Sequence, residues 1–304
     1  RRLFHTSSPI LSSVAEESPP KIKHFLPKRL ILIRHGESMG NQDETAYASI
    51  ADWRIPLTRR GERQSMRASK QLDELLAGEK LFTYYSPYKR ARETWDIIAD
   101  YLENSGQVEL VGAREEPRIS EQQFGNYQNP HKVRTAKAER KSFGRFYFRF
   151  PNGESGLDVY NRISSFLGTL SRDIRQLDEM QSWVDSFMEP MDIADRDPLK
   201  NTNILIVCHG LTLRLLLMRK FQLSVEEFEN SYNSQNAKLV ILDRVVDSKS
   251  GREFYRLQEE AKQALNLKGD VSNQRPVFMR TGYKEDSAVG RGLRILEEDS
   301  DMEE

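Results

Sequence analysis

The sequence predicts an α/β fold, a three-layer α/β/α sandwich around a mostly parallel central sheet. Two runs, 30–33 and 203–208, are almost continuously apolar and rich in β-branched residues, which is typical of strands buried on both faces of a parallel sheet. Stretches with helical periodicity separate the predicted strands, and this alternation is typical of layered α/β domains. The predicted strands are 30–33, 81–85, 108–111, 203–208 and 238–242.

The predicted helices begin beside residues that favour a helix start. Thr58 can cap the first turn of one helix with its hydroxyl, and Ser86-Pro87 precedes another. After Gly251, apolar residues recur with the spacing of one helix face, which predicts a further amphipathic helix. The predicted helices cover 60–76, 89–102, 158 to about 183, and 253–267.

Composition excludes several classes of protein. The 304 residues include 46 basic and 46 acidic side chains, so the formal net charge is zero, which argues against a general nucleic-acid or membrane-surface binder. A hydrophobic content of 38% is enough for a sizeable core. The single cysteine, Cys208, excludes an internal disulfide framework and a Cys-rich zinc site. No apolar run reaches the ~18 residues of a membrane-spanning helix. We therefore expect no nucleic-acid partner and no membrane partner.

Three segments are expected along the chain. Residues 1–28 are predicted to be disordered or transit-peptide-like, because basic and serine residues occur there without an acid before Glu16; the compartment is therefore mitochondrial or, alternatively, cytoplasmic. Residues 29–249 are predicted to form one catalytic domain. Residues 250–304 are expected to be a C-terminal extension whose acidic run, 297–304, is a solvated tail. A protein partner could bind through these terminal extensions.

Chemically distinctive side chains follow three of the predicted strands. Arg34, His35 and Gly36 come directly after the first strand, and His209 follows the strand at 203–208. Arg90 lies in the first turn of the helix after the strand at 81–85. The carboxyl ends of parallel strands meet at one edge of a sheet, where ligands of α/β proteins bind. Two histidines and two arginines at such an edge suit an anion with a nucleophile facing it.

At these positions the sequence resembles the histidine phosphatase superfamily, in the branch that includes phosphoglycerate mutases and fructose-2,6-bisphosphatases. The resemblance covers residues 29–244. Its motifs are Arg34-His35-Gly36-Glu37, Thr58 with Gly61 and Gln64, Ser86-Pro87-x-x-Arg90-Ala91-x-Glu93-Thr94, Glu121 ahead of Phe124-Gly125, and Val207-Cys208-His209-Gly210. Asp52-Trp53 and the runs 124–128 and 150–155 look most like plant and fungal phosphoglycerate-mutase-like phosphatases.

The resemblance implies hydrolysis of phosphomonoesters through a phosphohistidine. His35 would be the nucleophile, and Glu121 would protonate the leaving group and then accept a proton from water. The groups expected to bind the phosphoryl oxygens are Arg34, Asn41, Arg90 and His209. No metal and no cofactor are implied. The expected substrate is a phosphorylated small molecule or a phosphoprotein.

Departures from the mutase pattern favour a phosphatase over a mutase. Mutases of the family carry an Arg-His-Tyr run after the acidic residue, whereas this chain has Gln122, Gln123 and Phe124 there. The late motif continues with Leu211, where mutases place a polar residue. Fewer donors for a substrate carboxylate favour hydrolysis.

Two alternatives stay open from the sequence alone. The run Gly36-Glu37-Ser38-Met39-Gly40 fits the nucleophile elbow of serine hydrolases, although that interpretation leaves Arg34, His35 and Arg90 without a role. A catalytically idle scaffold or binding subunit of the same fold is the second alternative. The aromatic and basic segment 143–150 is interpreted as a lid or rim on the catalytic face, and Cys208 as a core residue.

Overall fold

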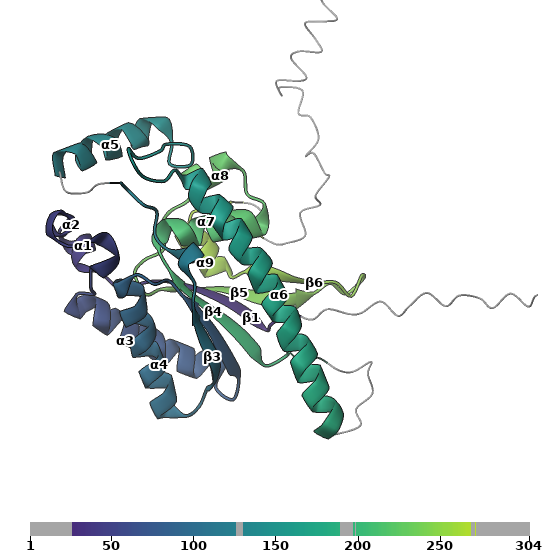
Figure 1. Cartoon of the computed structure of the whole chain (residues 1–304). Coiled ribbons are helices and arrows are strands. Elements are labelled where there is room, and N and C mark those ends of the chain that lie inside the picture. The colour runs from purple at the N-terminus through teal and green to yellow at the C-terminus, as the bar shows by residue number, and fades with distance from the viewer. Residues whose placement is uncertain (1–25, 126–129, 189–196, 198, 269–270, 272–304) are drawn as a thin grey trace, which may run out of the picture.

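The central sheet has six strands in the order β3-β2-β4-β1-β5-β6 (Figure 1). The computed structural model describes residues 26–125, 130–188, 197, 199–268 and 271. The first four strands of this order run parallel, and β5 and β6 pair antiparallel. The strands are β1 (Arg29–Arg34), β2 (Lys80–Tyr85), β3 (Glu109–Glu115), β4 (Thr202–Cys208), β5 (Leu239–Val246) and β6 (Glu253–Leu257). The predicted three-layer fold with a mostly parallel sheet is confirmed.

The sheet is covered on both faces, which explains the unbroken apolar runs in β1 and β4. Successive side chains of a strand point to opposite faces. In β1, Leu30 and Leu32 belong to one core cluster, whereas Ile31 and Ile33 belong to a second cluster on the other face. All four side chains are at most 5% exposed, so neither face of β1 could carry polar residues.

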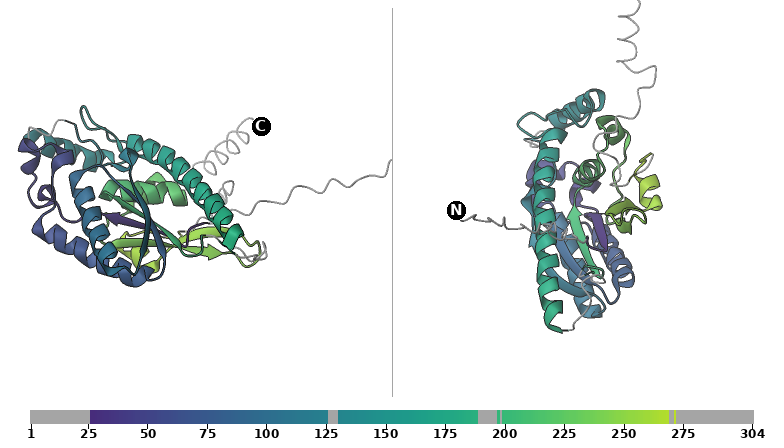
Figure 2. Two further views of the ribbon diagram at one scale, coloured as in Figure 1. Left: turned by 60° about the horizontal axis from the view of Figure 1, so that its bottom comes forward. Right: turned by 90° about the vertical axis from the view of Figure 1, so that its right-hand side faces the viewer.

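Two pairs of helices provide these covers. Helices α3 (Arg59–Leu76) and α4 (Lys89–Ser105) pack on one face, whereas α6 (Gly156–Met188) and α7 (Gly210–Phe221) pack on the other. Figure 2 shows α6 running along one side of the sheet. The remaining elements are α1 (Met39–Gln42), α2 (Ala46–Ser49), η1 (Asp52–Arg54), η2 (Pro117–Ile119), α5 (Pro130–Phe143), α8 (Val225–Asn230) and α9 (Glu259–Ala264).

Two of the predicted helix starts, those beside Thr58 and Ser86-Pro87, agree with the structure. Thr58 is the N-cap of α3, and its hydroxyl oxygen accepts a hydrogen bond from the Gly61 N–H at 3.0 Å. Helix α4 begins three residues after Ser86 and ends at Gly106, whose φ of 66° lies in the left-handed region that glycine tolerates. Helices α5, α7 and α8 were not predicted. Helix α7 is buried on nearly all sides and therefore shows little amphipathic periodicity.

The prediction of a helix over 253–267 is wrong in its first part. Residues 253–257 form β6, which pairs antiparallel with β5, and only the later residues form the short helix α9. Phe254 and Tyr255 are both buried, at 3% and 2% exposure, as neighbouring residues of a strand with both faces covered can be. The sheet thus continues past the predicted domain boundary at 249. Residues 1–25 of the segment 1–28, which was predicted to be disordered or transit-peptide-like, and the acidic run 297–304 lie outside the described residues.

Among the described residues, no helix combines the length and the apolar composition that crossing a bilayer requires.

We predict that Phe166→Ala lowers the free energy of unfolding by about 3–5 kcal/mol, because the ring of Phe166 is fully buried in the core under α6 and packs edge-on against Tyr84. Urea denaturation followed by circular dichroism measures the loss. Phe143→Ala is the matched control, because the Phe143 side chain is 68% exposed and its removal should change stability by no more than about 0.5 kcal/mol. Equal losses in both variants would contradict the core assignment.

Candidate active site

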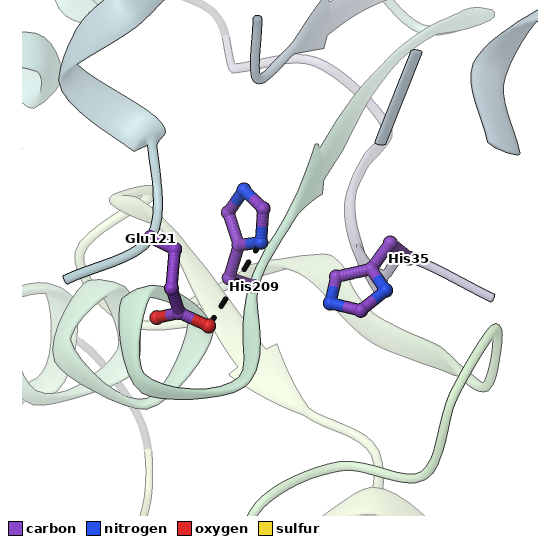
Figure 3. A group of neighbouring side chains, drawn as sticks. All are labelled: His35, Glu121 and His209. Carbon is purple, nitrogen blue, oxygen red and sulfur yellow. Dashed lines mark ion pairs between the residues drawn. The ribbon is translucent and has the colours of Figure 1, made fainter. Parts of the chain in front are cut away.

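The parallel pairing of β1 with β4 brings two histidines together. Arg34 lies opposite Cys208 in the register, and the backbone N–H of His35 donates to the Cys208 carbonyl at 3.0 Å. The residues that follow the two strands, His35 and His209, therefore leave the sheet at the same edge. Their ring centroids are 5.1 Å apart, and both side chains are buried. Figure 3 shows them together with Glu121.

The loop after His35 is held tightly against the start of α3. A Cβ atom added to Gly36 would lie 2.6 Å from the Gly61 carbonyl oxygen, and one added to Gly61 would lie 2.1 Å from the Glu37 carbonyl oxygen. The Glu37 N–H donates to Gln64 Oε1 at 2.8 Å, and the Thr58 hydroxyl donates to Glu37 Oε1 at 2.9 Å. Glycine is therefore required at positions 36 and 61, and these contacts account for the spacing of the motif formed by Thr58, Gly61 and Gln64.

The tautomer of His35 follows from a single contact. Nδ1 lies 2.6 Å from the backbone oxygen of Gly36, which can only accept, so Nδ1 carries the hydrogen. The lone pair is then on Nε2. Burial, followed by the positive charges of Arg90 and Arg34, holds the pKa of His35 well below its usual value. His35 is thus a neutral imidazole with a basic nitrogen in the site.

His209 can take the opposite arrangement of donor and acceptor. Its Nε2 lies 2.8 Å from the Ser86 hydroxyl, and the N–H of Tyr88 already donates to that same oxygen at 3.4 Å. A hydroxyl oxygen can donate one hydrogen bond and accept two, so Ser86 can donate to Nε2 while it accepts from Tyr88. The ring hydrogen of His209 is then on Nδ1. Burial and the charge of Arg90 hold the pKa of His209 well below its usual value.

The Nδ1 atom of His209 is buried without a hydrogen-bond partner among the described residues. It lies 3.9 Å from Glu121 Oε2, beyond hydrogen-bond distance. A buried donor without an acceptor costs about 1–3 kcal/mol, so such groups in folded proteins point to a ligand or a bound solvent molecule. An anionic oxygen between His209 and Glu121 would supply the missing acceptor.

Two guanidinium groups supply positive charge at this edge. Arg90 is 2% exposed, and its Nη1 donates to both the backbone oxygen and the carboxylate of Asp52, each at 2.8 Å. Arg34 donates from Nη1 to the Ser234 backbone oxygen at 3.1 Å, while its Nε is buried without a partner in the described chain. Sequence reasoning found both arginines and missed Asp52 as the anchor of Arg90.

Glu121 lies just beyond η2 and is the carboxyl group of the site. Its side chain is only 15% exposed, and burial raises its pKa, although the positive charge of Arg90 opposes this effect. The carboxyl therefore stays protonated to a higher pH than an exposed glutamate would.

Arg162 of α6 holds the backbone that carries Glu121, and sequence reasoning missed it. Its guanidinium donates to the backbone oxygens of Arg118, Ser120 and Glu121 at 2.7–2.9 Å. It also contacts both carboxylate oxygens of Glu154 at 3.0 and 3.1 Å. A planar guanidinium with five donors suits this task, whereas a lysine could not make all of these bonds. The sequence offers one signal for Arg162. Its partner Glu154 lies eight residues earlier, in the run 150–155 that resembles plant and fungal members of the family.

Asn41 lies beside the His35 loop. Its Oδ1 accepts from the Ser38 N–H at 3.2 Å and from Asn236 Nδ2 at 3.3 Å. Asn236 also donates to the backbone oxygen of His35 at 2.9 Å, so it fixes both groups. With the amide oxygen of Asn41 committed to these contacts, its NH₂ group is the part that can serve a ligand. Asn236 was not found from the sequence.

The segment 143–150 lies beside this edge of the sheet. Phe150 is buried and packs edge-on against Phe124, three residues beyond Glu121, with ring centroids 4.9 Å apart.

Cys208 is buried in the core under α6 and α7, as expected from the sequence.

Within the described part of the chain, one group of side chains has ligand atoms close enough to share a metal ion. The ligand atoms of His35, Glu121 and His209 lie within 4.8 Å of one another. Arg34 and Arg90 influence the same histidines electrostatically, and two fixed positive charges would repel a divalent cation. The charge of this group favours an anion instead.

The sheet edge thus defines a class of α/β proteins in which two histidines and two arginines meet at the carboxyl ends of parallel strands, with a charge that favours an anion. Comparison with known families specifies this class further. The sequence model of the histidine phosphatase superfamily (branch 1) matches residues 30–254, well over half of the chain. The chain belongs to this superfamily, as its motifs indicate.

Similar curated proteins include plant and fungal members. The phosphoglycerate mutase-like protein AT74H of Arabidopsis thaliana is 40% identical over 230 residues, which cover 73% of this chain and 75% of that protein. The broad-range acid phosphatase DET1 of Saccharomyces cerevisiae is 27% identical over 303 residues, covering 71% of this chain and 85% of the yeast protein. The expected likeness to plant and fungal proteins of this branch is confirmed.

Solved structures show the same fold. A mycobacterial glucosyl-3-phosphoglycerate phosphatase, crystallised with VO3, has a TM-score of 0.51 at 22% identity over 76% of this chain and 97% of its own. The α-ribazole phosphatase of Shigella flexneri has a TM-score of 0.50 at 23% identity, covering 79% of this chain and all of its own. At such identities the likeness concerns the fold alone.

We predict that His35 is a neutral imidazole with its hydrogen on Nδ1 and that it stays neutral well below pH 6.5, because burial and two guanidinium groups disfavour the cation. A pH titration by ¹⁵N NMR of the folded chain reads both the tautomer and the pKa. The urea-unfolded chain is the control, since its five histidines should titrate near about 6.5. Protonation of folded His35 at that ordinary pKa would contradict the prediction.

Proposed function

We propose that the protein is a metal-independent phosphomonoester hydrolase that acts through a phosphohistidine at His35. The observation that carries this proposal is the contact between His35 Nδ1 and the Gly36 oxygen. That contact leaves the Nε2 lone pair at a buried edge with two guanidinium groups. A neutral imidazole is a competent nucleophile toward phosphorus, whereas a protonated one is not.

In the first step, the Nε2 lone pair of His35 attacks phosphorus. The P–N bond forms as the ester P–O bond breaks, and the leaving oxygen takes the proton of Glu121. Burial raises the pKa of Glu121, so this proton is still present at mildly acidic pH. The products of this step are the free alcohol, phosphorylated His35 and the Glu121 carboxylate.

In the second step, a water molecule attacks the phosphohistidine. Glu121 accepts a proton from that water, the P–N bond breaks, and its electron pair returns to Nε2. Inorganic phosphate leaves, and both side chains regain their starting states. The Glu121 carboxyl group gives the proton in the first step and takes one in the second. The position of Glu121 beside His209 therefore serves both steps.

The charge on the phosphoryl oxygens is met by donors that are already in place. Arg34 and Arg90 are held by Ser234 and Asp52, and the Nδ1–H of His209 is unpartnered in the described chain. Preorganised donors of this kind stabilise the transition state of phosphoryl transfer without reorganisation. The NH₂ group of Asn41 is a further neutral donor.

Hydrolysis is favoured over a mutase reaction by the three residues after Glu121. Gln122 is buried, and its amide NH₂ donates to the Glu154 backbone oxygen at 2.8 Å, so it faces the protein. Gln123 is exposed, and Phe124 packs on Phe150. None of these three residues carries a positive charge for a substrate carboxylate. The name of the yeast relative, a broad-range acid phosphatase, supports the same conclusion.

The serine-hydrolase alternative is disfavoured by the position of Ser38. This side chain is 0% exposed, and the helix that follows it, α1, is only four residues long. His209, the base that this mechanism would need, is hydrogen-bonded to Ser86 instead.

A catalytically idle scaffold is disfavoured because the chain carries the nucleophile, the acid and the phosphoryl-binding groups that the proposed phosphatase mechanism uses. The substrate would be a phosphorylated small molecule or a phosphoprotein.

We predict turnover of an aryl phosphate by the protein in EDTA, together with an acid-labile phosphoenzyme in rapid-quench experiments. His35→Ala should abolish both, because the bond to phosphorus forms on its Nε2. Ser38→Ala is the matched control and should keep both signals. Turnover that needs an added metal, or that survives in folded His35→Ala, would refute the proposal.

We also predict an optimum at mildly acidic pH. Glu121 must be protonated for the first step, so kcat should fall as pH rises through its raised pKa. His35 must be neutral, so activity should fall on the acid side only below the lowered pKa of that ring.

The Glu121→Gln variant should lose the basic limb of the pH profile, and its kcat should fall by about 10²–10⁴-fold for an alkyl ester. The loss should be smaller for an aryl ester, whose leaving group needs less protonation. A rate that climbs steadily to about pH 9 would contradict this assignment.

A further inference from the structure

Residues 130–149, here called the cationic rim, concentrate positive charge in a chain whose net charge is zero. The rim contains seven basic side chains and one acidic side chain, Glu139, which gives it a formal charge of +6. Arg134, Lys141, Arg145 and Arg149 are exposed on it. Arg149 pairs with Asp158, and exposed ion pairs of this kind contribute little to stability.

The cationic rim borders the proposed active site on two sides. Lys137 of α5 forms an ion pair at 2.5 Å with Glu44, a residue of the segment that joins α1 and α2. Figure 1 shows α5 above these two helices. Arg140 Nη1 donates to the side chain of Gln122, the neighbour of Glu121, at 3.4 Å. The rim therefore spans from the segment after the His35 loop to the segment that carries the proposed general acid.

Exposed aromatic rings accompany these charges. Phe143 is 68% exposed and Tyr147 is 57% exposed, whereas Phe146 and Phe150 are buried and anchor the segment. A 14-residue helix is about 21 Å long, which is more than a small phosphorylated metabolite can cover. Extended positive charge interleaved with apolar rings matches an acidic polypeptide segment better than a small anion.

An acidic segment with matching charge is present in the same chain. Residues 297–304 contain six carboxylates and no basic residue, so their formal charge is −6. The 25 residues between Val271, the last described position, and residue 297 could span up to about 80 Å. A domain with the length of the predicted catalytic domain, residues 29–249, has a radius of gyration of about 17 Å. Residues 297–304 can therefore reach any face of the domain.

We propose that residues 297–304 dock on the cationic rim of their own chain and compete there with anionic substrates. The competition rests on the proposed phosphatase function, whereas the docking does not. Each exposed ion pair is weak, but a tethered segment acts at an effective concentration on the order of millimolar. The contact should therefore be partial at physiological salt and sensitive to ionic strength.

A chain ending at residue 296 tests the competition. With a small aryl phosphate at about 20 mM salt, we expect KM to fall by about 3- to 10-fold and kcat to stay unchanged. At about 0.5 M salt the difference should vanish, because the screening length is then only about 4 Å. An unchanged KM at low salt would overturn the competition.

Binding of the acidic peptide tests the docking without any turnover. A fluorescent peptide with the sequence of residues 297–304 should bind the shortened chain at low salt, and Lys141→Glu/Arg145→Glu should abolish this binding. Arg63→Glu/Lys70→Glu on α3 changes the charge equally at exposed positions and is the matched control. Equal binding by both double variants, or none by the shortened chain, would overturn the proposal.

The two readouts separate the possible failures. If no variant turns over substrate, the phosphatase proposal fails, yet peptide binding still decides the docking. If Lys141→Glu/Arg145→Glu raises KM equally in the full and shortened chains, the rim attracts substrate directly and the tail is not its ligand.

Discussion

The site depends on the parallel pairing of β1 with β4. This pairing sets Arg34 beside Cys208 and lets the next residues, His35 and His209, emerge at one edge of the sheet. On its other side β4 pairs with β2, which is also parallel to it. The end of β2 is fixed to β4 by the Ser86 N–H, which donates to the Val207 backbone oxygen at 3.0 Å. An antiparallel arrangement would have placed these groups at opposite edges. The sheet topology is therefore the scaffold of the chemistry, and the helices fix the details.

Burial gives the site its electrostatic character. It keeps both imidazoles neutral, because a charged ring would lose its hydration beside two guanidinium groups. Four side-chain polar atoms in the described residues are buried without a partner, and two of them are Arg34 Nε and His209 Nδ1. Both are donors. A phosphoryl group would bring the negative charge and the acceptors that this edge of the sheet lacks, so in the proposed mechanism binding and catalysis use the same groups.

The sequence predicted those parts of the fold and the site that depend on neighbours along the chain. Both faces of β1 are buried, so its apolar run was unambiguous, and His35 and His209 were found because they directly follow strands. Asp52, Arg162 and Asn236 were missed because their roles come from tertiary contacts. Arg90 and Asp52 are 38 residues apart, and Asn236 meets His35 across 201 residues. The prediction of a helix over 253–267 is wrong for residues 253–257, because a short apolar segment can match both the helix and the strand period. Pairing with β5 makes these residues a strand.

The central claim is that the phosphoryl group passes through a covalent bond to His35, and the stereochemical course at phosphorus tests it most directly. Each in-line attack inverts the configuration. Transfer from a substrate with a chiral, isotopically labelled phosphoryl group should therefore proceed with net retention, since attack by His35 and attack by water are two successive inversions. Net inversion would mean that water attacks the ester directly, and His35 would then have another role.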